Sequence, residues 1–391
     1  MFARYVLFCF WPVLAGASSY QTLYTFPPGT GPAAPDTGLV LAQNGVLYGA
    51  IASSQNLPNG AIFAFNLASS SLSLVYSFHD TGDGAAPQQT LIFDQSGKLY
   101  GTTEFGGNQA CETGGCGTVF KLDPATGRLT TLHAFSDFAT EGAYPDSGSL
   151  MFGLGGALYG ETPYGGSLGG GTMYSISPAG GALTTLAAYS NTPVGAMAVT
   201  KAGVIYGATL AGGRAGVGTV FSLTPPAEGD SAWTAETLYS FTGTTDGGYP
   251  YGGVIAGRAG AIFGTTQAGG NGPGDGTAFE FVPATGDFRT IRRFSADSGT
   301  APYAPLCVDT AKDLLGVAPT GGADPRKCQS GCGTVFRLGN PGWAVTVVHE
   351  FANGAGGRGP QSPLVGDSKG HFYGTAGGGR GVGGIIFEVT P

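Results

Sequence analysis

The sequence predicts an all-β protein, a seven-bladed β-propeller with four antiparallel strands in each blade. A Tyr-Gly step, or a Phe-Gly or Leu-Gly variant, occurs seven times at intervals of 47 to 59 residues. A fixed proline and a Leu-x-x-Phe stretch, or a close variant, precede each step. A regular period of this length is typical of repeat architectures, and four-stranded units arranged radially leave few exposed sheet edges. The seven anchors are Tyr48, Tyr100, Tyr159, Tyr206, Phe263, Leu315 and Tyr373.

The unit around Tyr100 illustrates the four strands that we expect in each repeat. The first is residues 75–78, and it is followed by a polar, Gly-rich loop and Pro87. A proline suits a strand entry because it lacks a ladder donor and presets φ. The second strand is residues 90–94, the third is 99–103, and the fourth is 117–122. The Gly that follows the anchor permits close approach of a neighbouring backbone.

The two ends of the chain indicate how the ring closes. Residues 23–26 form a lone strand of the Leu-x-x-Phe type, and residues 385–389 form a last strand that lacks its following partner. We therefore expect the N-terminal strand to complete the last blade. A linear solenoid would carry polar capping repeats at its ends, and the sequence shows none.

The first 17 residues have the pattern of a cleaved signal peptide. Arg4 precedes an apolar stretch at residues 5–14 and a small-residue site at 15–17. That stretch is too short to anchor the chain across a bilayer. We expect a secreted or periplasmic protein with a single propeller domain of residues 18–391, no lipobox cysteine, no membrane span and no C-terminal anchor.

The repeat resembles a known family. Tyr-Gly-Thr-Thr, a Gly-Gly loop and Gly-Thr-Val-Phe-Lys-Leu, best seen in residues 100–122 and 206–223, are similar to the GloVer tandem repeat of bacterial exported proteins. The resemblance covers roughly residues 20–391. It implies export and a repeat fold, and it supplies no catalytic residues. The motif departs at residues 315–318 and 384–387, where we expect less regular packing.

The charge balance narrows the classes of partner. The chain has 17 basic and 25 acidic residues, and charged residues make up only 11%. No Lys/Arg run occurs, which argues against a nucleic-acid or anionic-membrane partner. We expect a monomer without cofactor or metal, whose partner is a carbohydrate, cell-envelope material or another protein.

Cysteines mark two lengthened loops. One loop contains Cys111 and Cys116, and the other contains Cys328 and Cys332. In an oxidising compartment this placement predicts one local disulfide in each loop. The alternative, a zinc site, would need the two pairs to be adjacent, whereas they belong to blades four apart. We expect Cys307 to be a buried strand thiol that behaves as a small hydrophobe.

A site is expected on one face of the ring, around the central channel. Strand order places the loop before each proline and the Gly-rich loop after each Tyr-Gly on that face, and both are long and variable. Their acids and tyrosines could bind a sugar by hydrogen bonds and stacking, and two carboxylates at a suitable separation could hydrolyse it. The alternative is that turns need the acids and that each Tyr packs at the mouth of a blade. The candidates are Asp83, Glu141, Tyr144, Asp146, Asp246, Tyr249, Tyr251, Asp297 and Tyr303.

Glu161 is a further candidate because it breaks the repeat. It stands where Thr102 stands in the preceding unit. The alternative is drift at a solvated position, which loops tolerate. The chain has no His-Glu-x-x-His or phosphate-cradling motif, and no catalytic residue can be assigned.

These observations leave three functional hypotheses. The leading one is an exported binding or interaction module for glycan or cell-envelope material. The second is a carbohydrate-active enzyme, either a glycoside hydrolase or a polysaccharide lyase, with its site at the channel mouth. The third is a purely structural role.

Overall fold

A computed structural model describes residues 18–27, 37–80, 82–108, 111, 114–146, 148–322, 328, 330–379 and 382–391. The expected signal peptide, residues 1–17, lies outside the described residues. The described part of the chain contains strands β1 to β29 and three short 3-10 turns, with no α-helix among them. None of its helical segments is long and apolar enough to cross a membrane.

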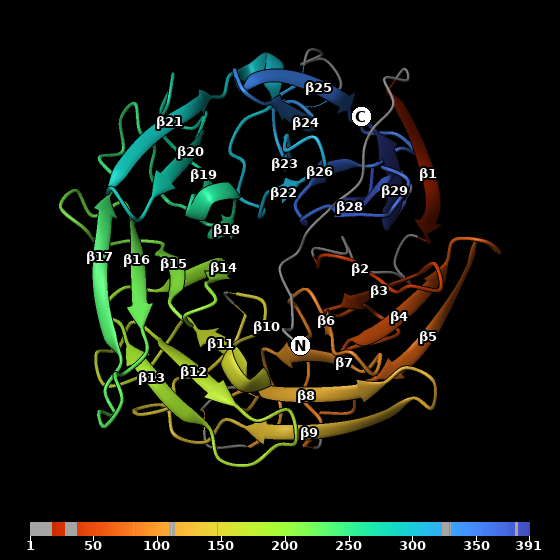
Figure 1. The fold of residues 1–391 in the computed structure, drawn as a ribbon. Helices are drawn as coiled ribbons and strands as arrows, with labels where there is room; N and C mark the ends of the chain where they lie inside the picture. The colour runs from red at the N-terminus through yellow and green to blue at the C-terminus, as the bar shows by residue number, and fades with distance from the viewer. Residues whose placement is uncertain are drawn as a thin grey trace.

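Seven antiparallel sheets form a closed ring (Figure 1), which confirms the predicted propeller. Blade 1 comprises β2 (Val40–Leu41), β3 (Val46–Ile51), β4 (Ala61–Asn66) and β5 (Ser71–Ser77). Blade 2 comprises β6 (Ile92–Phe93), β7 (Leu99–Thr103), β8 (Thr118–Asp123) and β9 (Arg128–Ala134). Blade 3 comprises β10 (Met151–Phe152), β11 (Leu158–Thr162), β12 (Thr172–Ile176) and β13 (Thr184–Ala188).

The remaining blades repeat this order. Blade 4 comprises β14 (Pro193–Val199), β15 (Ile205–Thr209), β16 (Thr219–Thr224) and β17 (Thr234–Ser240). Blade 5 comprises β18 (Val254–Ala256), β19 (Ile262–Thr266), β20 (Thr277–Val282) and β21 (Asp287–Arg293). Blade 6 comprises β22 (Cys307–Val308), β23 (Leu314–Ala318), β24 (Thr334–Gly339) and β25 (Ala344–Glu350). The 3-10 turns are η1 (Leu154–Gly156), η2 (Arg258–Gly260) and η3 (Ala296–Ser298).

Blade 7 is built from both ends of the chain. Its strands are β26 (Arg358–Pro360), β27 (Val365–Gly366), β28 (Phe372–Gly377), β29 (Gly384–Thr390) and β1 (Ser19–Phe26). The β1–β29 ladder runs from Ser19 opposite Thr390 to Phe26 opposite Gly384. The ring of Tyr20 stacks on His349 of blade 6 with 3.5 Å between centroids. The N-terminal strand therefore closes the ring as predicted, and Figure 1 shows it beside β29.

The Tyr-Gly and Val-Phe halves of the repeat are two sides of one contact. Gly101 lies opposite Phe120 in the β7–β8 ladder, and a Cβ at Gly101 would lie 2.6 Å from Phe120 Cζ. The Gly is required because the tip of the Phe120 ring occupies the space that a Cβ would need. Every blade has this pairing: Gly49 with Phe63, Gly101 with Phe120, Gly160 with Tyr174, Gly207 with Phe221, Gly264 with Phe279, Gly316 with Phe336, and Gly374 with Phe387.

Blades 6 and 7 keep this register despite their altered motifs. The expectation of less regular packing at residues 315–318 and 384–387 is therefore wrong for these pairings. The altered residues do not disturb the strand pairing, because the contact between the strands depends on the Gly and on the aromatic ring opposite it. Blade 7 does differ at its inner edge, which is divided between β26 and β27.

The fixed prolines join consecutive blades. Of the six fixed prolines within the described residues, only Pro193 begins a strand, so strand entry does not explain the other five. A Cβ at Gly117 would lie 2.6 Å from Pro145 Cδ, which shows that the proline ring packs on the glycine before the preceding blade's Thr-Val-Phe. The residue before it, Tyr144, has φ 56° and donates its N–H to Cys116 O at 2.9 Å. A left-handed backbone at this position thus makes a blade-to-blade hydrogen bond.

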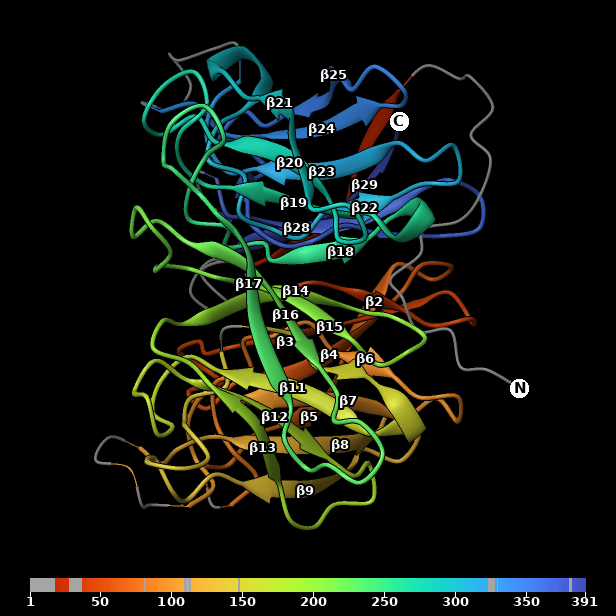
Figure 2. The same ribbon diagram turned by 60° about the vertical axis from the view of Figure 1, so that its left-hand side comes forward.

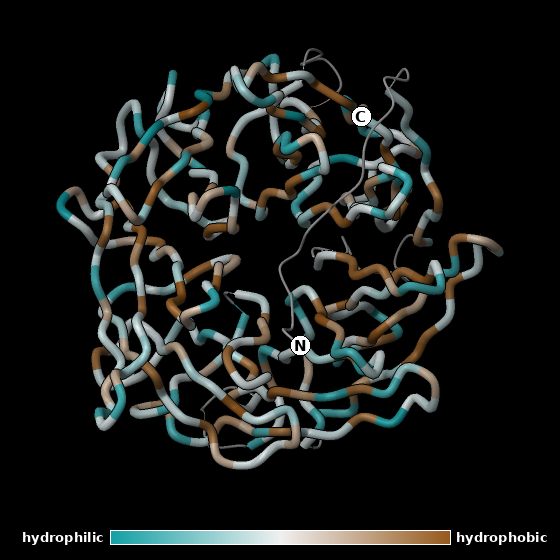
Figure 3. Tube along the Cα trace, in the orientation of Figure 1, coloured by the Kyte–Doolittle hydropathy of each residue, from teal (hydrophilic) through white to brown (hydrophobic). Residues whose placement is uncertain are grey.

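The hydrophobic core lies between the blades. Phe78 at the end of blade 1 packs edge-on against Phe120 of blade 2, with 5.4 Å between ring centroids. Both side chains are buried, and burying a Phe side chain contributes roughly 1.5–3 kcal/mol. Figure 3 shows hydrophobic stretches along the strands and hydrophilic ones at the connecting turns. Figure 2 shows the connecting loops extending on either side of the strands.

Both predicted disulfides are present. Cys111 is bonded to Cys116 and Cys328 to Cys332. Cys307 is buried, with 1% of its surface exposed, but it too is disulfide-bonded, with its partner outside the described residues. The expectation of a free thiol at Cys307 is therefore wrong. A strand sequence shows that a cysteine is buried but does not show which distant sulfur reaches it.

Candidate binding site at the channel mouth

The two long loop sets share one face of the ring, as predicted. In four blades a residue of the loop before the proline bridges a residue of the Gly-rich loop after Tyr-Gly. The bridged pairs are Ala85 with Phe105, Ala143 with Tyr164, Gly248 with Ala268, and Thr300 with Thr320. We call this side of the ring the loop face.

A cavity of about 300 Å³ occupies the central channel. The innermost strands line it and begin at the loop face. Small or polar residues, such as Thr90 and Ser149, come first along these strands. Large apolar residues, such as Phe93 and Phe152, follow toward the opposite face. The lining is predominantly apolar, and its two polar residues, Thr90 and Ser149, lie at its loop-face end.

The residue after each fixed proline precedes the channel lining of its blade by two to four residues, on the loop-face side. We call these the rim residues: Gln88, Asp146, Val194, Tyr251, Tyr303 and Gln361. The seventh, Asp36, lies outside the described residues. Tyr251 is 42% exposed, and its ring lies edge-on to Tyr303 of the next blade with 6.2 Å between centroids. The rim therefore carries polar or aromatic side chains in blades 2, 3, 5, 6 and 7, and the buried Val194 in blade 4.

A pair of carboxyl groups lies between blades 2 and 3 of this rim. The half-buried Glu104 accepts a hydrogen bond from the Gln88 side chain. Gln89 Nε2 donates to the main-chain oxygen of Asp146, which ties the two blades together. Burial, and then the nearby Glu104 charge, raise the pKa of the Asp146 carboxyl to about 7. Burial also raises the pKa of Glu104, against the opposing effect of the Gln88 hydrogen bond.

These pKa values give the rim mixed hydrogen-bonding capacity. A carboxyl with a pKa near 7 is present both as a donor and as an acceptor at neutral pH. Beside it are the Gln88 amide and the Glu104 carboxyl, and at another part of the rim are the Tyr251 and Tyr303 rings. This part of the rim therefore offers both hydrogen-bond donors and acceptors.

Comparison with protein families shows what the chain is related to. The model of the Gloeobacter/Verrucomicrobia repeat matches residues 9–198 and 192–391. The chain belongs to this family. The match covers nearly the whole chain in two spans, which agrees with the resemblance inferred from its Tyr-Gly and Gly-Thr-Val-Phe motifs.

Solved structures share the fold of this Gloeobacter/Verrucomicrobia repeat protein. A putative 6-phosphogluconolactonase from Bacteroides uniformis matches with a TM-score of 0.51 and 14% identity, over 81% of this chain and 84% of that one. Another from Bacteroides fragilis has a TM-score of 0.52 and 14% identity, over 84% and 86%. The GH74 enzyme of Niastella koreensis has a TM-score of 0.61 and 14% identity, over 94% of this chain and 53% of the enzyme. At such identities the likeness shows the fold alone. No curated protein matches significantly.

Three acids that were predicted as site residues of this repeat protein instead contact polar groups of their own strand and loop. Asp246 accepts hydrogen bonds from Tyr239 Oη at 2.9 Å and from Thr242 N at 2.9 Å. Asp83 likewise accepts from the hydroxyl of Tyr76 at 2.8 Å. Glu141 lies 3.2 Å from His133 Nε2. These carboxylates tie the end of the outer strand to the following loop, which supports the alternative that turn chemistry placed them there.

The other predicted residues are divided between the rim and the outer loops. Asp146, Tyr251 and Tyr303 belong to the rim. Tyr144 packs edge-on against Phe105 and Tyr164 at centroid distances of 5.7 and 6.1 Å. The remaining two candidates, Tyr249 and Asp297, are exposed on the loops.

Glu161 is fully buried in β11, with 0% of its surface exposed. The alternative of drift at a solvated position is therefore wrong. Burial raises the pKa of its carboxyl to about 8. The carboxyl is not part of the rim, and it is considered separately below.

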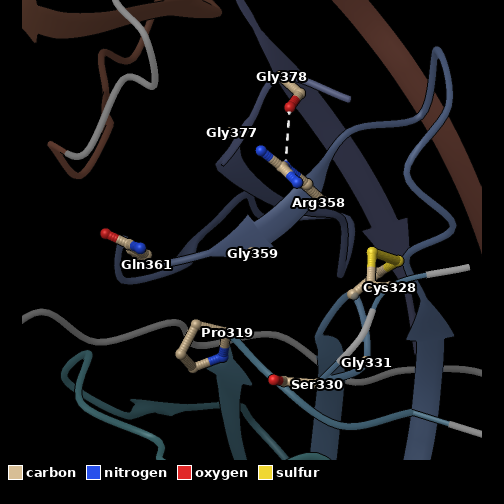
Figure 4. Close-up of a pocket in the computed structure, with 10 residues that line it drawn as sticks. Pro319, Cys328, Ser330, Gly331, Arg358, Gly359, Gln361, Gly377 and Gly378 are labelled. Atoms are coloured by element: carbon tan, nitrogen blue, oxygen red, sulfur yellow. Dashed lines mark hydrogen bonds between the residues drawn. A yellow bond between two sulfur atoms is a disulfide. The ribbon is translucent and has the colours of Figure 1, made fainter. Parts of the chain in front are cut away.

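A second cavity, of about 370 Å³, lies between blades 6 and 7. Arg358 and Gln361 line it from blade 7, and Pro319 and Ser330 line it from blade 6 (Figure 4). Arg358 Nε donates to Gly378 O at 3.2 Å, which holds the guanidinium at the cavity wall. Because Gln361 is also a rim residue, this cavity extends the rim outward.

Sequence reasoning missed Gln88, Glu104, Arg358 and Gln361. Gln88 and Gln361 could have been found from the sequence, because each directly follows a fixed proline. The residues after the seven prolines occupy equivalent positions in the repeat. Glu104 and Arg358 carry no such signal. Their relevance depends on contacts between loops that are distant in the sequence.

Proposed function

We propose that the protein is an exported carbohydrate-binding propeller that holds its ligand at the channel rim. The observations that carry this proposal are the Tyr251–Tyr303 ring pair and the Gln88–Glu104–Asp146 group, both formed by loop-face residues that precede the channel lining. Aromatic rings present apolar faces with polar tips, and a few converging polar groups orient a ligand. A sugar offers apolar C–H faces for the former and hydroxyls for the latter. Two local disulfides are typical of an oxidising compartment, which supports export.

A glycan array of the mature chain, residues 18–391, tests the proposal. Tyr251→Ala is expected to weaken binding of any positive glycan by about tenfold or more, as is typical of removing a central aromatic contact. The matched control is Tyr164→Ala, because Tyr164 is an exposed loop-face tyrosine outside the rim. A positive glycan bound equally well by Tyr251→Ala and wild type would contradict the proposal, as would an array with no positive glycan.

A second candidate function is glycoside hydrolysis by Glu104 and Asp146. It is favoured by the raised pKa of Asp146, about 7, because an acid that keeps its proton near neutral pH can protonate a leaving oxygen while a nearby carboxylate acts as base or nucleophile. Release of reducing sugar from bound polysaccharides is the assay. Asp146→Asn and Glu104→Gln should each abolish turnover, whereas turnover that survives both changes would remove this candidate.

A further inference from the structure

Blade 3 differs from the other six at three buried positions. The first is the ring that covers the anchor glycine, which is Phe in six blades and Tyr174 in blade 3. The second is the aromatic residue that ends the outer strand, which is Phe in six blades and Tyr189 in blade 3. The third follows the anchor glycine and is Ala, Thr or Val elsewhere but Glu161 in blade 3. One blade therefore replaces three apolar or weakly polar groups by a carboxyl and two phenols.

These three groups surround β11: Tyr189 lies in the contact with blade 4, whereas Tyr174 packs on Phe135 of blade 2 with 5.3 Å between ring centroids. Glu161 and Tyr174 have 0% exposed surface and Tyr189 has 8%. Tyr174 lies opposite Gly160, the neighbour of Glu161. Tyr189 packs on Phe221 of blade 4 with 5.1 Å between ring centroids. After burial, the Glu161 charge is the next cause that raises the pKa values of both phenols.

None of the four polar atoms has a hydrogen-bond partner among the described residues. They are both carboxyl oxygens of Glu161 and the hydroxyls of Tyr174 and Tyr189. A buried polar group without a partner is destabilising, and a buried charge without one is far more so. A protonated carboxyl lowers this penalty, because it is neutral and can both donate and accept.

The Glu161 carboxyl touches the backbone that forms the channel wall. A Cβ at Gly148 would lie 2.5 Å from Glu161 Oε2 and 2.7 Å from Gly195 O. Gly195 belongs to β14, and the residues after the two glycines, Ser149 and Ala196, line the channel. The absence of side chains at both glycines leaves only main chain between the carboxyl and the channel.

Within the described part of the chain, no positively charged group faces this carboxyl. The titratable groups around it are Tyr159 on its own strand, Tyr174 on β12 and Tyr189 after β13. The nearest acid on the loop before β10 is Asp146, two residues before Gly148. The other two strands packed against β11, β10 and β14, contribute no titratable side chain. An ionised Glu161 can therefore be stabilised only by water, which must enter between the two glycines.

We propose that Glu161, Tyr174 and Tyr189 form a pH-responsive latch in the channel wall, closed while Glu161 holds its proton and opened when it ionises. Opening separates Gly148 from Gly195 and admits water from the channel. Because Gly148 follows Asp146 closely, the movement also displaces the rim between blades 3 and 4. The latch is independent of which ligand the rim binds.

The direction of the pH effect follows from burial. Burial raises the pKa of Glu161 from its ordinary 4.5 to about 8 in the folded chain. The stabilising effect of the bound proton is complete below pH 4.5 and is lost as pH rises toward 8. One proton bound only in the folded state makes the unfolding equilibrium constant rise about tenfold per pH unit in this window. Asp146 adds an effect of the same sign up to its pKa of about 7.

Glu161→Gln tests the latch while keeping the size of the side chain. Denaturant unfolding at several pH values from 5 to 8 gives the unfolding equilibrium constant at each pH. This constant should rise less steeply with pH in Glu161→Gln than in wild type, by about tenfold per pH unit. Glu161→Thr, which restores the residue found at this position in three other blades, should do the same. The triple variant Glu161→Thr/Tyr174→Phe/Tyr189→Phe restores the residues common to the other blades. Its unfolding equilibrium constant should also rise less steeply with pH than that of wild type.

Amide hydrogen exchange separates a local latch from a purely global effect. In wild type, the amides of β11 and β14 should lose protection between pH 6 and pH 9, after correction for the intrinsic pH dependence of exchange, whereas β20 should not. All three variants should keep this protection at pH 9. Equal pH slopes of unfolding in wild type and Glu161→Gln would overturn the proposal, as would unchanged protection of β14 in wild type at pH 9.

Discussion

Asp146 shows how two effects act on a single carboxyl group of the rim. Burial removes water from it, and the charge of Glu104 adds repulsion to its ionised form. When Glu104 is neutral, burial alone raises the pKa of Asp146. The two contributions can therefore be separated by changing Glu104 while leaving the surrounding packing in place.

Glu104→Gln is expected to lower the pKa of Asp146 below about 7 but to leave it above its ordinary value of 3.8, because only the charge contribution is removed. The measurement is the pH titration of carboxyl carbon signals by NMR in protein labelled at aspartate. Glu280→Gln is the control, because Glu280 pairs with Arg289 on an outer edge of blade 5. An Asp146 titration that is the same in Glu104→Gln and wild type would show that Glu104 does not act on it.

The threonines of the repeat act at the scale of the element, because they hold together two strands at the loop face. Thr103 Oγ1 lies 2.9 Å from Thr118 Oγ1 and accepts a hydrogen bond from Thr118 N at 3.1 Å. The same hydroxyl pair occurs between β11 and β12, β15 and β16, and β19 and β20. It satisfies a buried N–H at the start of the fourth strand, where the ladder ends.

Thr103→Val should therefore destabilise the protein by about 1–3 kcal/mol, since it leaves the buried Thr118 N–H without its acceptor. Thr130→Val, in the exposed part of β9, should change the free energy of unfolding by less than about 0.5 kcal/mol. Denaturant unfolding at constant pH measures both. Equal stabilities of the two variants would show that the hydroxyl pair contributes little beyond its shape.

The elements were predictable because their signals are local and repeated. Tyr100-Gly101 and the facing Val119-Phe120 identify two adjacent strands, and seven copies fix their order. The rim was predictable only in part. Tyr251 stands out as an aromatic in a polar loop, but Glu104 matters through Gln88 and Asp146, which come from other loops. Burial of Glu161 was missed because the equivalent Thr102 occupies a position that looks solvated in sequence, although both are buried.

At the scale of the whole molecule, stability depends on the single ladder between β1 and β29. The Tyr20 ring, which stacks on His349, also lies 5.9 Å from the Phe387 ring between centroids, and Phe26 lies 5.7 Å from the Phe63 ring of blade 1. The first strand thus contacts both of its neighbouring blades. Its absence would leave β29 as an unpaired edge, which is a template for pairing with other chains.

A chain that begins at Pro27 is therefore expected to self-associate, and a peptide of residues 18–26 added in excess should restore the monomer. Size-exclusion chromatography coupled to light scattering provides the readout. A peptide with Tyr20→Ala and Phe26→Ala keeps the backbone and serves as the control, because it lacks the two ring contacts. A truncated chain that stays monomeric and keeps the unfolding midpoint of the full-length protein would show that β1 is dispensable.

The closing ladder also determines how the molecule responds to tension. Ser19 pairs with Thr390, so both ends of the ring leave from the same end of one antiparallel pair. A force that pulls the termini apart would load the hydrogen bonds of this ladder one after another, in an unzipping geometry, and would not load them all at once in shear. The ring should then yield at low force by peeling off its first strand, while the other six blades remain intact until the break reaches them. A propeller closed in this way is mechanically weak along the line that joins its own chain ends.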